Sequence, residues 1–185
     1  MHAKIKDFKT IVIPCYGDER GAFHELFHLK RFEDITGNEF NFKQVNHSES
    51  KKGVLRGIHV APFSKIVHCL KGRIFDVTVD LRVNSPTYLK WDYITLTPGW
   101  QTHIPACCGH AFYTLEASTI VYAQDGVYDK SREIEIRWND PELNILWPHF
   151  NAPPLLSEKD ANCSYLRSAL WKMEEINRSW RTDGK

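Results

Sequence analysis

Apolar and polar residues alternate strictly along Phe75–Arg82, the clearest local pattern in the chain. Such alternation predicts a β-strand with one buried face and one polar face. A second strand is predicted over Lys65–Leu70, where most residues are apolar and several are β-branched, and Lys71-Gly72 forms a tight turn between the two. The stretch Lys51–Arg82 is therefore organised around a central hairpin.

Further short strands are predicted along the rest of the chain, separated by turns rich in glycine and proline: Thr10–Ile13, Ala22–His28, Phe40–Ser48, Trp91–Leu96, Thr102–Pro105, Ala111–Leu115, Ile120–Gln124 and Glu133–Trp138. Gly109-His110 is expected at a bend between two of them. About ten short, evenly spaced strands indicate an all-β sandwich or barrel. We favour a double-sheet jelly roll, and the pattern alone leaves an up-and-down barrel open.

Two helices are predicted. A short one covers Lys30–Thr36 and is closed by Gly37. A C-terminal helical tail covers about 160–180, where apolar residues recur at spacings of three and four: Leu166, Leu170, Met173, Ile176 and Trp180. The 185 residues are expected to form one domain, 1–185.

Composition narrows the classes of function. The formal net charge is +1, from 24 basic and 23 acidic residues, which argues against nucleic acid and anionic membranes as partners. No apolar run approaches the length of a transmembrane helix, and the N-terminus does not resemble a signal peptide, so we expect a cytoplasmic protein. The five cysteines, without a C-x-x-C pair, are expected to be reduced thiols.

Candidate chemistry gathers just before the central hairpin, where Arg56, His59 and Lys65 lie close in sequence. Two cations and a group that titrates near neutrality suit an enzyme acting on an anionic, enolisable substrate. Taken alone this signal is weak, because an isolated histidine beside a strand is more often structural.

Six blocks in order add a stronger signal: DERGAFHELF (Asp18–Phe27), FKQVNHSESKKGVLRGIH (Phe42–His59), KIVHCLKGRIFDVTVDLRVNSPTYLKW (Lys65–Trp91), IPACCGHAF (Ile104–Phe112), IRWNDPELNILWP (Ile136–Pro148) and LSEKDA (Leu156–Ala161). With these blocks the chain resembles the dTDP-4-dehydrorhamnose 3,5-epimerase family of cupin-like nucleotide-sugar epimerases. The resemblance implies a cupin-like jelly roll, a homodimer, and no metal or other cofactor. It also implies epimerisation of a nucleoside-diphospho-4-keto-6-deoxy sugar at C3, C5 or both, in deoxysugar biosynthesis for a surface polysaccharide or a glycosylated metabolite.

The resemblance also assigns catalytic roles. His59 matches the family's general base, and Asp160 matches the carboxylate that orients it. Tyr122 matches the acid that returns a proton from the opposite face of the sugar. Lys65 matches a lysine near the keto oxygen, where it could stabilise the enolate.

Substrate-binding positions follow in the same way. Arg56 matches the arginine that binds the diphosphate, and Arg20 is expected to help with the anion or to come from the partner subunit. Other pocket positions are Glu25, Gln44, Asn46, His110 and Tyr128. Without the family, Lys65 and Arg20 would read as surface charges, Tyr122 as a core residue and His110 as a loop histidine.

The chain departs from the family beside the pocket. The segment Val60–Lys65 is shorter than usual, Ala111 stands where a glycine is usual, and Cys107-Cys108 replaces a glycine and an aromatic residue. The nucleobase, the carbon that is epimerised and the pathway therefore stay open. So do three other functions: a sugar-nucleotide 3,4-ketoisomerase, a non-catalytic sugar-nucleotide-binding protein and, despite the absence of an H-x-H pair, a metal-dependent cupin.

Overall fold

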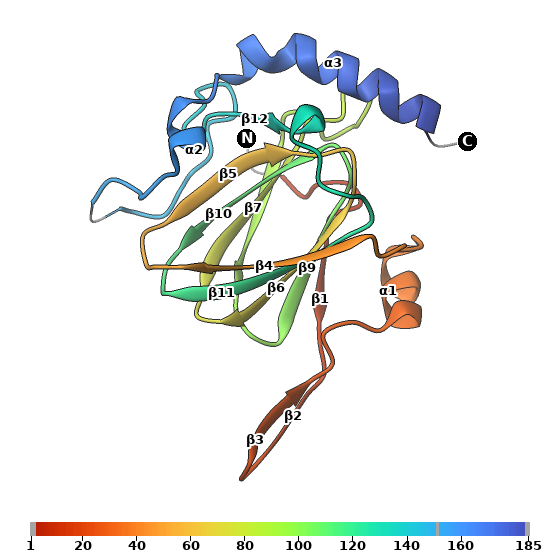
Figure 1. Ribbon diagram of the computed structural model, residues 1–185, viewed down its shortest axis with the longest axis vertical. Coiled ribbons are helices and arrows are strands. Elements are labelled where there is room, and N and C mark those ends of the chain that lie inside the picture. Colours follow the sequence, from red (N-terminus) through yellow and green to blue (C-terminus); the bar gives the residue numbers. More distant parts are fainter. Residues whose placement is uncertain (1–2, 151, 184–185) are drawn as a thin grey trace.

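The computed structural model describes residues 3–150 and 152–183, with side chains as far as Glu174, and contains two five-stranded antiparallel sheets (Figure 1). The first sheet has the order β1 (Lys9–Val12), β9 (Trp100–Ile104), β6 (Lys65–Lys71), β11 (Ser118–Gln124) and β4 (Gln44–Ser50). The second has the order β12 (Ile134–Glu135), β5 (Leu55–Val60), β10 (Cys108–Thr114), β7 (Ile74–Asp80) and β8 (Trp91–Leu96).

From β4 to β12 the chain changes sheet at every step except between β7 and β8. In an up-and-down barrel each strand would instead pair with the next one along the chain. The double-sheet jelly roll favoured by the sequence pattern is therefore confirmed. Apolar side chains from both sheets, including Val67 and Ile120 of the first and Ile74 and Phe112 of the second, fill part of the space between them.

The strand β7 was correctly predicted, but its polar face is not turned to solvent: all seven residues from Ile74 to Asp80 are buried. Phe75, Val77 and Val79 pack outward, in one cluster with Leu166 and Met173 of the C-terminal segment. The intervening polar residues therefore face the space between the sheets. This inversion places polar groups inside the jelly roll, where a site can form.

The outer face of the first sheet is covered by α1 (Leu29–Thr36), which the sequence predicted. Phe32 of this helix packs with Phe40, Ile66 and Ala123. Gly37 ends the helix in a left-handed conformation at φ 70°, which glycine adopts without steric cost.

A two-stranded hairpin, β2 (Cys15–Asp18) paired with β3 (Gly21–His24), projects away from the two sheets (Figure 1). We call residues 15–24 the arm. Its aromatic side chains Tyr16 and Phe23 lie side by side, with ring centroids 6.4 Å apart, and both are exposed.

The helix expected over about 160–180 is interrupted, which corrects that prediction. A short helix, α2 (Glu158–Asn162), is separated from α3 (Leu166–Asp183), which crosses one end of the molecule (Figure 1). The interruption arises because Ser164 bridges Ile136 in extended conformation and Asp140 accepts a hydrogen bond from the Leu166 amide at 2.7 Å. Ile176 and Trp180, which belong to the apolar pattern that predicted this helix, lie outside the described side chains.

A single 3-10 turn, η1 (Lys130–Arg132), precedes β12. The half-buried strand predicted over Glu133–Trp138 is reduced to the two residues of β12. Within the described ranges, no helix is long and apolar enough to cross a membrane.

Candidate active site

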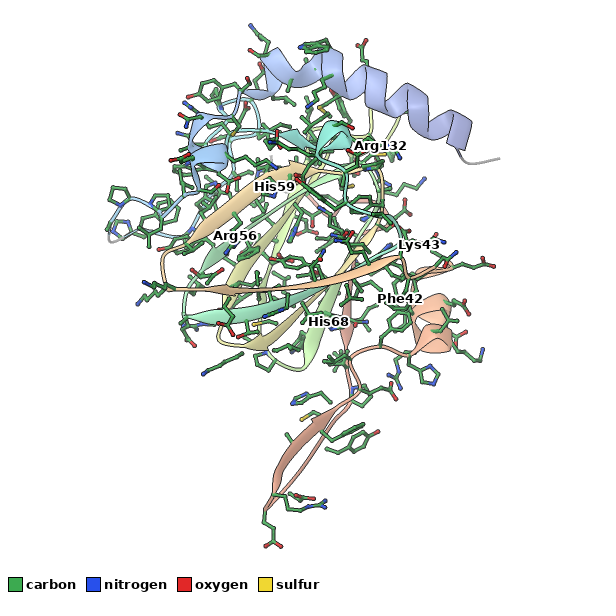
Figure 2. All side chains as sticks on the ribbon, in the orientation of Figure 1. Phe42, Lys43, Arg56, His59, His68 and Arg132 are labelled. Carbon is green, nitrogen blue, oxygen red and sulfur yellow. The ribbon has the colours of Figure 1, made fainter. Side chains whose placement is uncertain are left out.

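The strand β5, which sequence analysis missed, carries both Arg56 and His59. Between these positions one residue of β10 opposes two residues of β5, so β5 contains a bulge at Gly57. Leu55, Ile58 and Val60 pack outward in the same cluster as the C-terminal segment. The bulge therefore turns both Arg56 and His59 toward the space between the sheets, and Figure 2 shows them at two points along β5.

His59 pairs with Asp160 of α2. The His59 Nε2 and Asp160 Oδ1 atoms are 2.7 Å apart, although 101 residues separate them in the chain. Asp160 also accepts a hydrogen bond from the Ser157 hydroxyl at 2.8 Å. Burial tends to raise the pKa of Asp160, but the hydrogen bonds from His59 and Ser157 outweigh it and hold the pKa below its ordinary value. The carboxylate is thus ionised and can orient the imidazole.

His110 lies directly opposite His59 in the pairing of β5 with β10. The prediction that Gly109-His110 forms a bend is wrong, because both residues lie inside β10 and pair with β7 on the other side. A Cβ atom at Gly109 would lie 2.5 Å from the Ile58 side chain, so this glycine permits close packing within the sheet.

Asp76 of β7 is a site residue that sequence reasoning did not single out. Its carboxylate accepts hydrogen bonds from His110 Nε2 at 2.6 Å and from the Thr102 hydroxyl at 2.9 Å. Thr102 belongs to the opposite sheet, so Asp76 links the two sheets while fixing the His110 ring. An aspartate on an otherwise half-apolar strand was the available signal, but it was read only as part of the strand's polar face.

Tyr122 reaches the same space from β11 in the first sheet. Its ring centroid is 6.4 Å from that of His110, and its hydroxyl is 3.0 Å from the Ser48 hydroxyl. Burial raises the pKa of Tyr122 to about 12, against smaller opposing effects of Ser48 and Arg56. Tyr122 is therefore a protonated phenol at neutral pH.

Lys65 of β6 is buried, with only 7% of its surface exposed. Its ammonium lies 5.6 Å from the centroid of the Phe63 ring, and no hydrogen bond or ion pair holds it within the part of the chain that the structure describes. Burial lowers its pKa, with a smaller opposing effect of Glu133. A buried cation without a fixed partner is suited to an anion that develops on a bound substrate.

Three predicted pocket residues form a polar border beside Tyr122. Asn46 is the direct neighbour of Tyr122 between β4 and β11. The Gln44 amide donates to Asn46 Oδ1 at 2.9 Å, and Gln44 Oε1 accepts from the Tyr128 amide at 2.8 Å. Arg56 completes the border on the second sheet, where its Nε donates to the Ser50 hydroxyl at 3.1 Å.

Arg20 and Glu25 are not brought to this group of residues within the chain. Arg20 lies at the tip of the arm, with 86% of its side chain exposed, and pairs with Asp18. Glu25 follows β3 and forms an ion pair with Arg31 of α1. Whether Arg20 and Glu25 reach an active site therefore depends on what the arm packs against.

The site thus combines a carboxylate-oriented imidazole, a protonated phenol, a buried ammonium and an arginine. Such a set can remove a proton beside a carbonyl, stabilise the resulting enolate and return a proton. No group of three or more histidine, cysteine, aspartate or glutamate side chains is arranged to hold a metal ion among the described residues.

Comparison with known proteins identifies the family of the chain. The family described as dTDP-4-dehydrorhamnose 3,5-epimerase matches residues 2–168. A dTDP-4-dehydrorhamnose 3,5-epimerase from Shigella flexneri is 44% identical over 166 residues, which are 86% of this chain and 91% of the relative.

Two solved structures have the same fold. The 3,5-epimerase of Legionella pneumophila, in complex with dTDP-4-keto-L-rhamnose, has a TM-score of 0.87 and 37% identity, over 94% of this chain and 95% of the other. A 3'-monoepimerase of Streptomyces bikiniensis, in complex with dTDP-quinovose, has a TM-score of 0.84 and 31% identity, over 98% of this chain and 100% of the other. The chain therefore belongs to the dTDP-4-dehydrorhamnose 3,5-epimerase family and is an epimerase-type isomerase of deoxysugar biosynthesis.

Proposed function

We propose that this protein epimerises a nucleoside-diphospho-4-keto-6-deoxy sugar at C3, C5 or both, through an enolate. The observation that carries the proposal is the pairing of His59 with Asp160 at 2.7 Å in a space that also receives Tyr122 from the opposite sheet. Epimerisation needs a base on one face of the sugar and an acid on the other, and groups from two facing sheets suit that requirement.

In the proposed reaction, neutral His59 removes the hydrogen beside the ketone. The electron pair of the C–H bond moves to the C4 oxygen, and the resulting enolate is stabilised by the Lys65 ammonium. Asp160 stabilises the imidazolium that forms on His59. The Tyr122 phenol then donates its proton to the carbon from the other face, and the ketone re-forms. The His59 imidazolium releases the abstracted proton to solvent, and Tyr122 recovers a proton from solvent.

The remaining pocket residues bind the nucleotide. The planar guanidinium of Arg56 suits the diphosphate because it can donate to two oxygens at once. His110, held by Asp76, is positioned to donate to the sugar, and Asn46, Gln44 and Tyr128 border the space on the side of the first sheet.

The protein acts as a homodimer in this proposal, and the arm, together with the residue that follows it, supplies Arg20 and Glu25 to the partner's site. An isolated two-stranded hairpin with exposed aromatic residues is poorly stabilised on its own, and Tyr16 and Phe23 are both exposed. Packing against a second copy would bury them and would add a cation to a site where Arg56 faces a diphosphate.

The test is incorporation of deuterium from heavy water. The protein is incubated with dTDP-4-keto-6-deoxyglucose, then with the CDP and GDP counterparts, and C3 and C5 are followed by NMR. Label at both carbons is expected for a 3,5-epimerase, and label at one carbon identifies a single-site enzyme. The nucleotide that gives the fastest exchange identifies the substrate class.

The His59→Ala variant is expected to abolish exchange while substrate binding is largely kept. His47→Ala is the matched control, because His47 lies on β4 and is exposed. Unchanged exchange in His59→Ala would remove His59 as the base. Binding without exchange in the unaltered protein would favour a binding role, and migration of the keto group from C4 to C3 would favour a 3,4-ketoisomerase.

A further inference from the structure

Asp160 is the one member of the proposed catalytic set that does not come from a β-strand. It lies in α2, a helix of five residues that packs on the edge of the second sheet (Figure 1). The distance between Asp160 and His59 therefore depends on what holds α2 against β12 and β5. This question rests on the proposed function, and it concerns residues to which no role has yet been given.

Lys159, the neighbour of Asp160 in α2, is held by two carboxylates. Its Nζ atom lies 2.6 Å from Glu133 Oε2 and 2.6 Å from Glu135 Oε1. Burial tends to lower the pKa of Lys159, but the two carboxylates outweigh it and raise the pKa above its ordinary value. The side chain is therefore charged at neutral pH.

The two carboxylates lie on or next to β12, the edge strand that pairs with the His59 strand β5. Glu135 lies directly opposite His59 in the pairing of β12 with β5, so both side chains project from the same face. Glu133 is more deeply buried than Glu135, with 9% and 20% of their side chains exposed.

We propose that Lys159 is a positioning residue for the His59–Asp160 pair: it ties α2 to β12 and offsets part of the negative charge of two carboxylates beside the base. A single ammonium thereby fixes the helix that carries Asp160. It also keeps Glu133 and Glu135 from favouring the protonated imidazole, which cannot act as a base.

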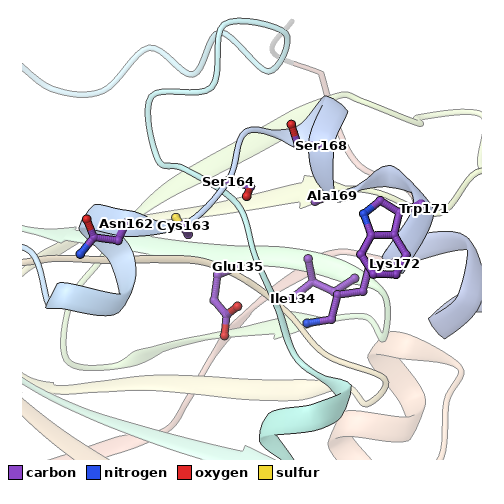
Figure 3. Close-up of a pocket in the computed structure, with 9 residues that line it drawn as sticks. All are labelled: Ile134, Glu135, Asn162, Cys163, Ser164, Ser168, Ala169, Trp171 and Lys172. Atoms are coloured by element: carbon purple, nitrogen blue, oxygen red, sulfur yellow. The ribbon is translucent and has the colours of Figure 1, made fainter.

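Solvent reaches this cluster from one side, so its charges are only partly screened. A cleft of about 240 Å³ opens between β12 and the start of α3, lined by Glu135, Cys163, Lys172 and their neighbours (Figure 3). Lys159 itself is 36% exposed. At partial burial, loss of one positive charge from this cluster is expected to move the titration of the neighbouring imidazole by about one pH unit.

Other titratable and charged groups lie beside His59 on each neighbouring element. Asp160 approaches from α2, His110 from β10, Glu135 from β12 and Arg56 from β5 itself. Lys65 interacts with both Glu133 and Lys159 through space. Among these residues, Lys159 contacts two of the carboxylates and also adjoins Asp160 in the chain. Its removal should therefore change both the position of Asp160 and the charge around His59.

The experiment compares three variants with the unaltered protein. Lys159→Met removes the ammonium at similar length, Lys159→Arg keeps the charge, and Lys159→Met with Glu135→Gln removes one charge of each sign. The matched control is Lys172→Met, because Lys172 also contacts Glu133 but through the backbone carbonyl at 3.0 Å. Each protein is assayed for kcat, KM and their dependence on pH, with circular dichroism as a check on folding.

For Lys159→Met we expect kcat to fall about tenfold with KM nearly unchanged, because misplacement of a catalytic group slows chemistry more than binding. The acidic limb of the pH profile is expected to move up by about one pH unit. Lys159→Arg and Lys172→Met are expected to keep the original profile, and the double variant is expected to return most of the shift. A rise in KM alone would mean that Lys159 contacts the substrate, and an unshifted profile would remove the charge role; either result overturns the proposal.

A readout without turnover separates this proposal from the proposed function. With ¹⁵N-labelled histidine, the titration of the His59 ring is followed by NMR in the unaltered protein and in Lys159→Met. An upward move of about one pH unit in the variant is expected even if no sugar nucleotide is turned over. Superimposable titrations would contradict the inference, whatever the substrate proves to be.

Discussion

Arg56 and His59 point to the same side of β5 although they lie three positions apart, because the bulge at Gly57 adds one residue to the strand. In a regular strand, residues an odd number of positions apart lie on opposite faces. The bulge thus brings the proposed diphosphate ligand and the proposed base into one space. It depends on a residue without a side chain.

Gly57→Ala is expected to lower the free energy of unfolding by about 3 kcal/mol and to reduce kcat strongly. Gly57 has φ 116°, and a Cβ atom there would lie 2.5 Å from the Ala111 Cβ and 2.6 Å from the His110 carbonyl oxygen. Chemical denaturation and exchange assays measure the two effects. Gly99→Ala is the control, because Gly99 also has a positive φ but no atom within 4 Å of a Cβ at that position. It should cost about 1 kcal/mol and leave activity unchanged; equal losses in both variants would contradict this account.

Asp76→Asn is expected to reduce kcat by about tenfold or more, since an amide cannot accept from both Thr102 and His110 as the carboxylate does. Misorientation of the His110 ring should act on the chemical step more than on KM. Steady-state kinetics with the substrate found by the exchange assay measure both constants.

The matched change two residues along β7 is Thr78→Val. Thr78 faces the same side as Asp76 and is fully buried, and its hydroxyl has no hydrogen-bond partner within the residues described. Removal of that hydroxyl should leave activity intact and stability unchanged or improved. A similar loss of kcat in both variants would mean that any change on this face disturbs the site.

Stability is expected to fall as the pH drops from about 6.5 toward 4. Burial lowers the pKa of His68 and of His103 to about 4, from an ordinary value of 6.5. The unfolded chain therefore binds these protons before the folded one does, and each histidine destabilises the fold at low pH by up to about 3 kcal/mol.

Urea denaturation from pH 7 to pH 4 tests this dependence. His68→Gln and His103→Gln should each flatten the curve of unfolding free energy against pH, and the double variant should flatten it further. The His103 ring packs edge-on against Phe32 at 5.1 Å, so the His103 variant is also expected to be less stable at pH 7. If the variants' curves of unfolding free energy against pH run parallel to that of the unaltered protein, the loss of stability in acid comes from carboxylates and not from these histidines.

Two inactive variants are expected to restore activity when mixed. If Arg20 acts in the partner's site, a heterodimer of Arg20→Ala and His59→Ala contains one intact site and one doubly altered site. Equal mixing with free exchange then gives about a quarter of the normal activity. Light scattering coupled to size-exclusion chromatography measures the dimer. Activity no greater than the mean of the two variants would place Arg20 outside the partner's site.

Local pattern predicted much of the fold, and the limits of that prediction are physical. The alternation of Phe75–Arg82 correctly indicated a strand with one apolar face. It could not indicate which face is inside, because that depends on the C-terminal segment packing against Phe75, Val77 and Val79. The strand β5 was missed because the bulge at Gly57 breaks its alternation.

The contacts of the candidate site could be predicted less well from local sequence pattern. His59 and Asp160 are 101 residues apart, and only the family resemblance joined them before the structure did. The resemblance could not indicate Asp76, which contacts His110 across the sheet, or the clamp of Lys159 by Glu133 and Glu135. These contacts depend on which elements pack together, and local periodicity carries no information about that.

The two faces of β7 have a consequence for how this enzyme can change by mutation. Residues 75, 77 and 79 contact the C-terminal layer, whereas residues 76 and 78 face the space in which the reaction is proposed to occur. Adjacent codons thus affect different properties. Substitutions in the first set act on the melting temperature, and substitutions in the second that change side-chain size or charge, rather than remove one hydroxyl, act on the range of sugars accepted. Directed evolution could randomise the two sets in separate libraries, selecting thermal tolerance from the first and new substrate preference from the second.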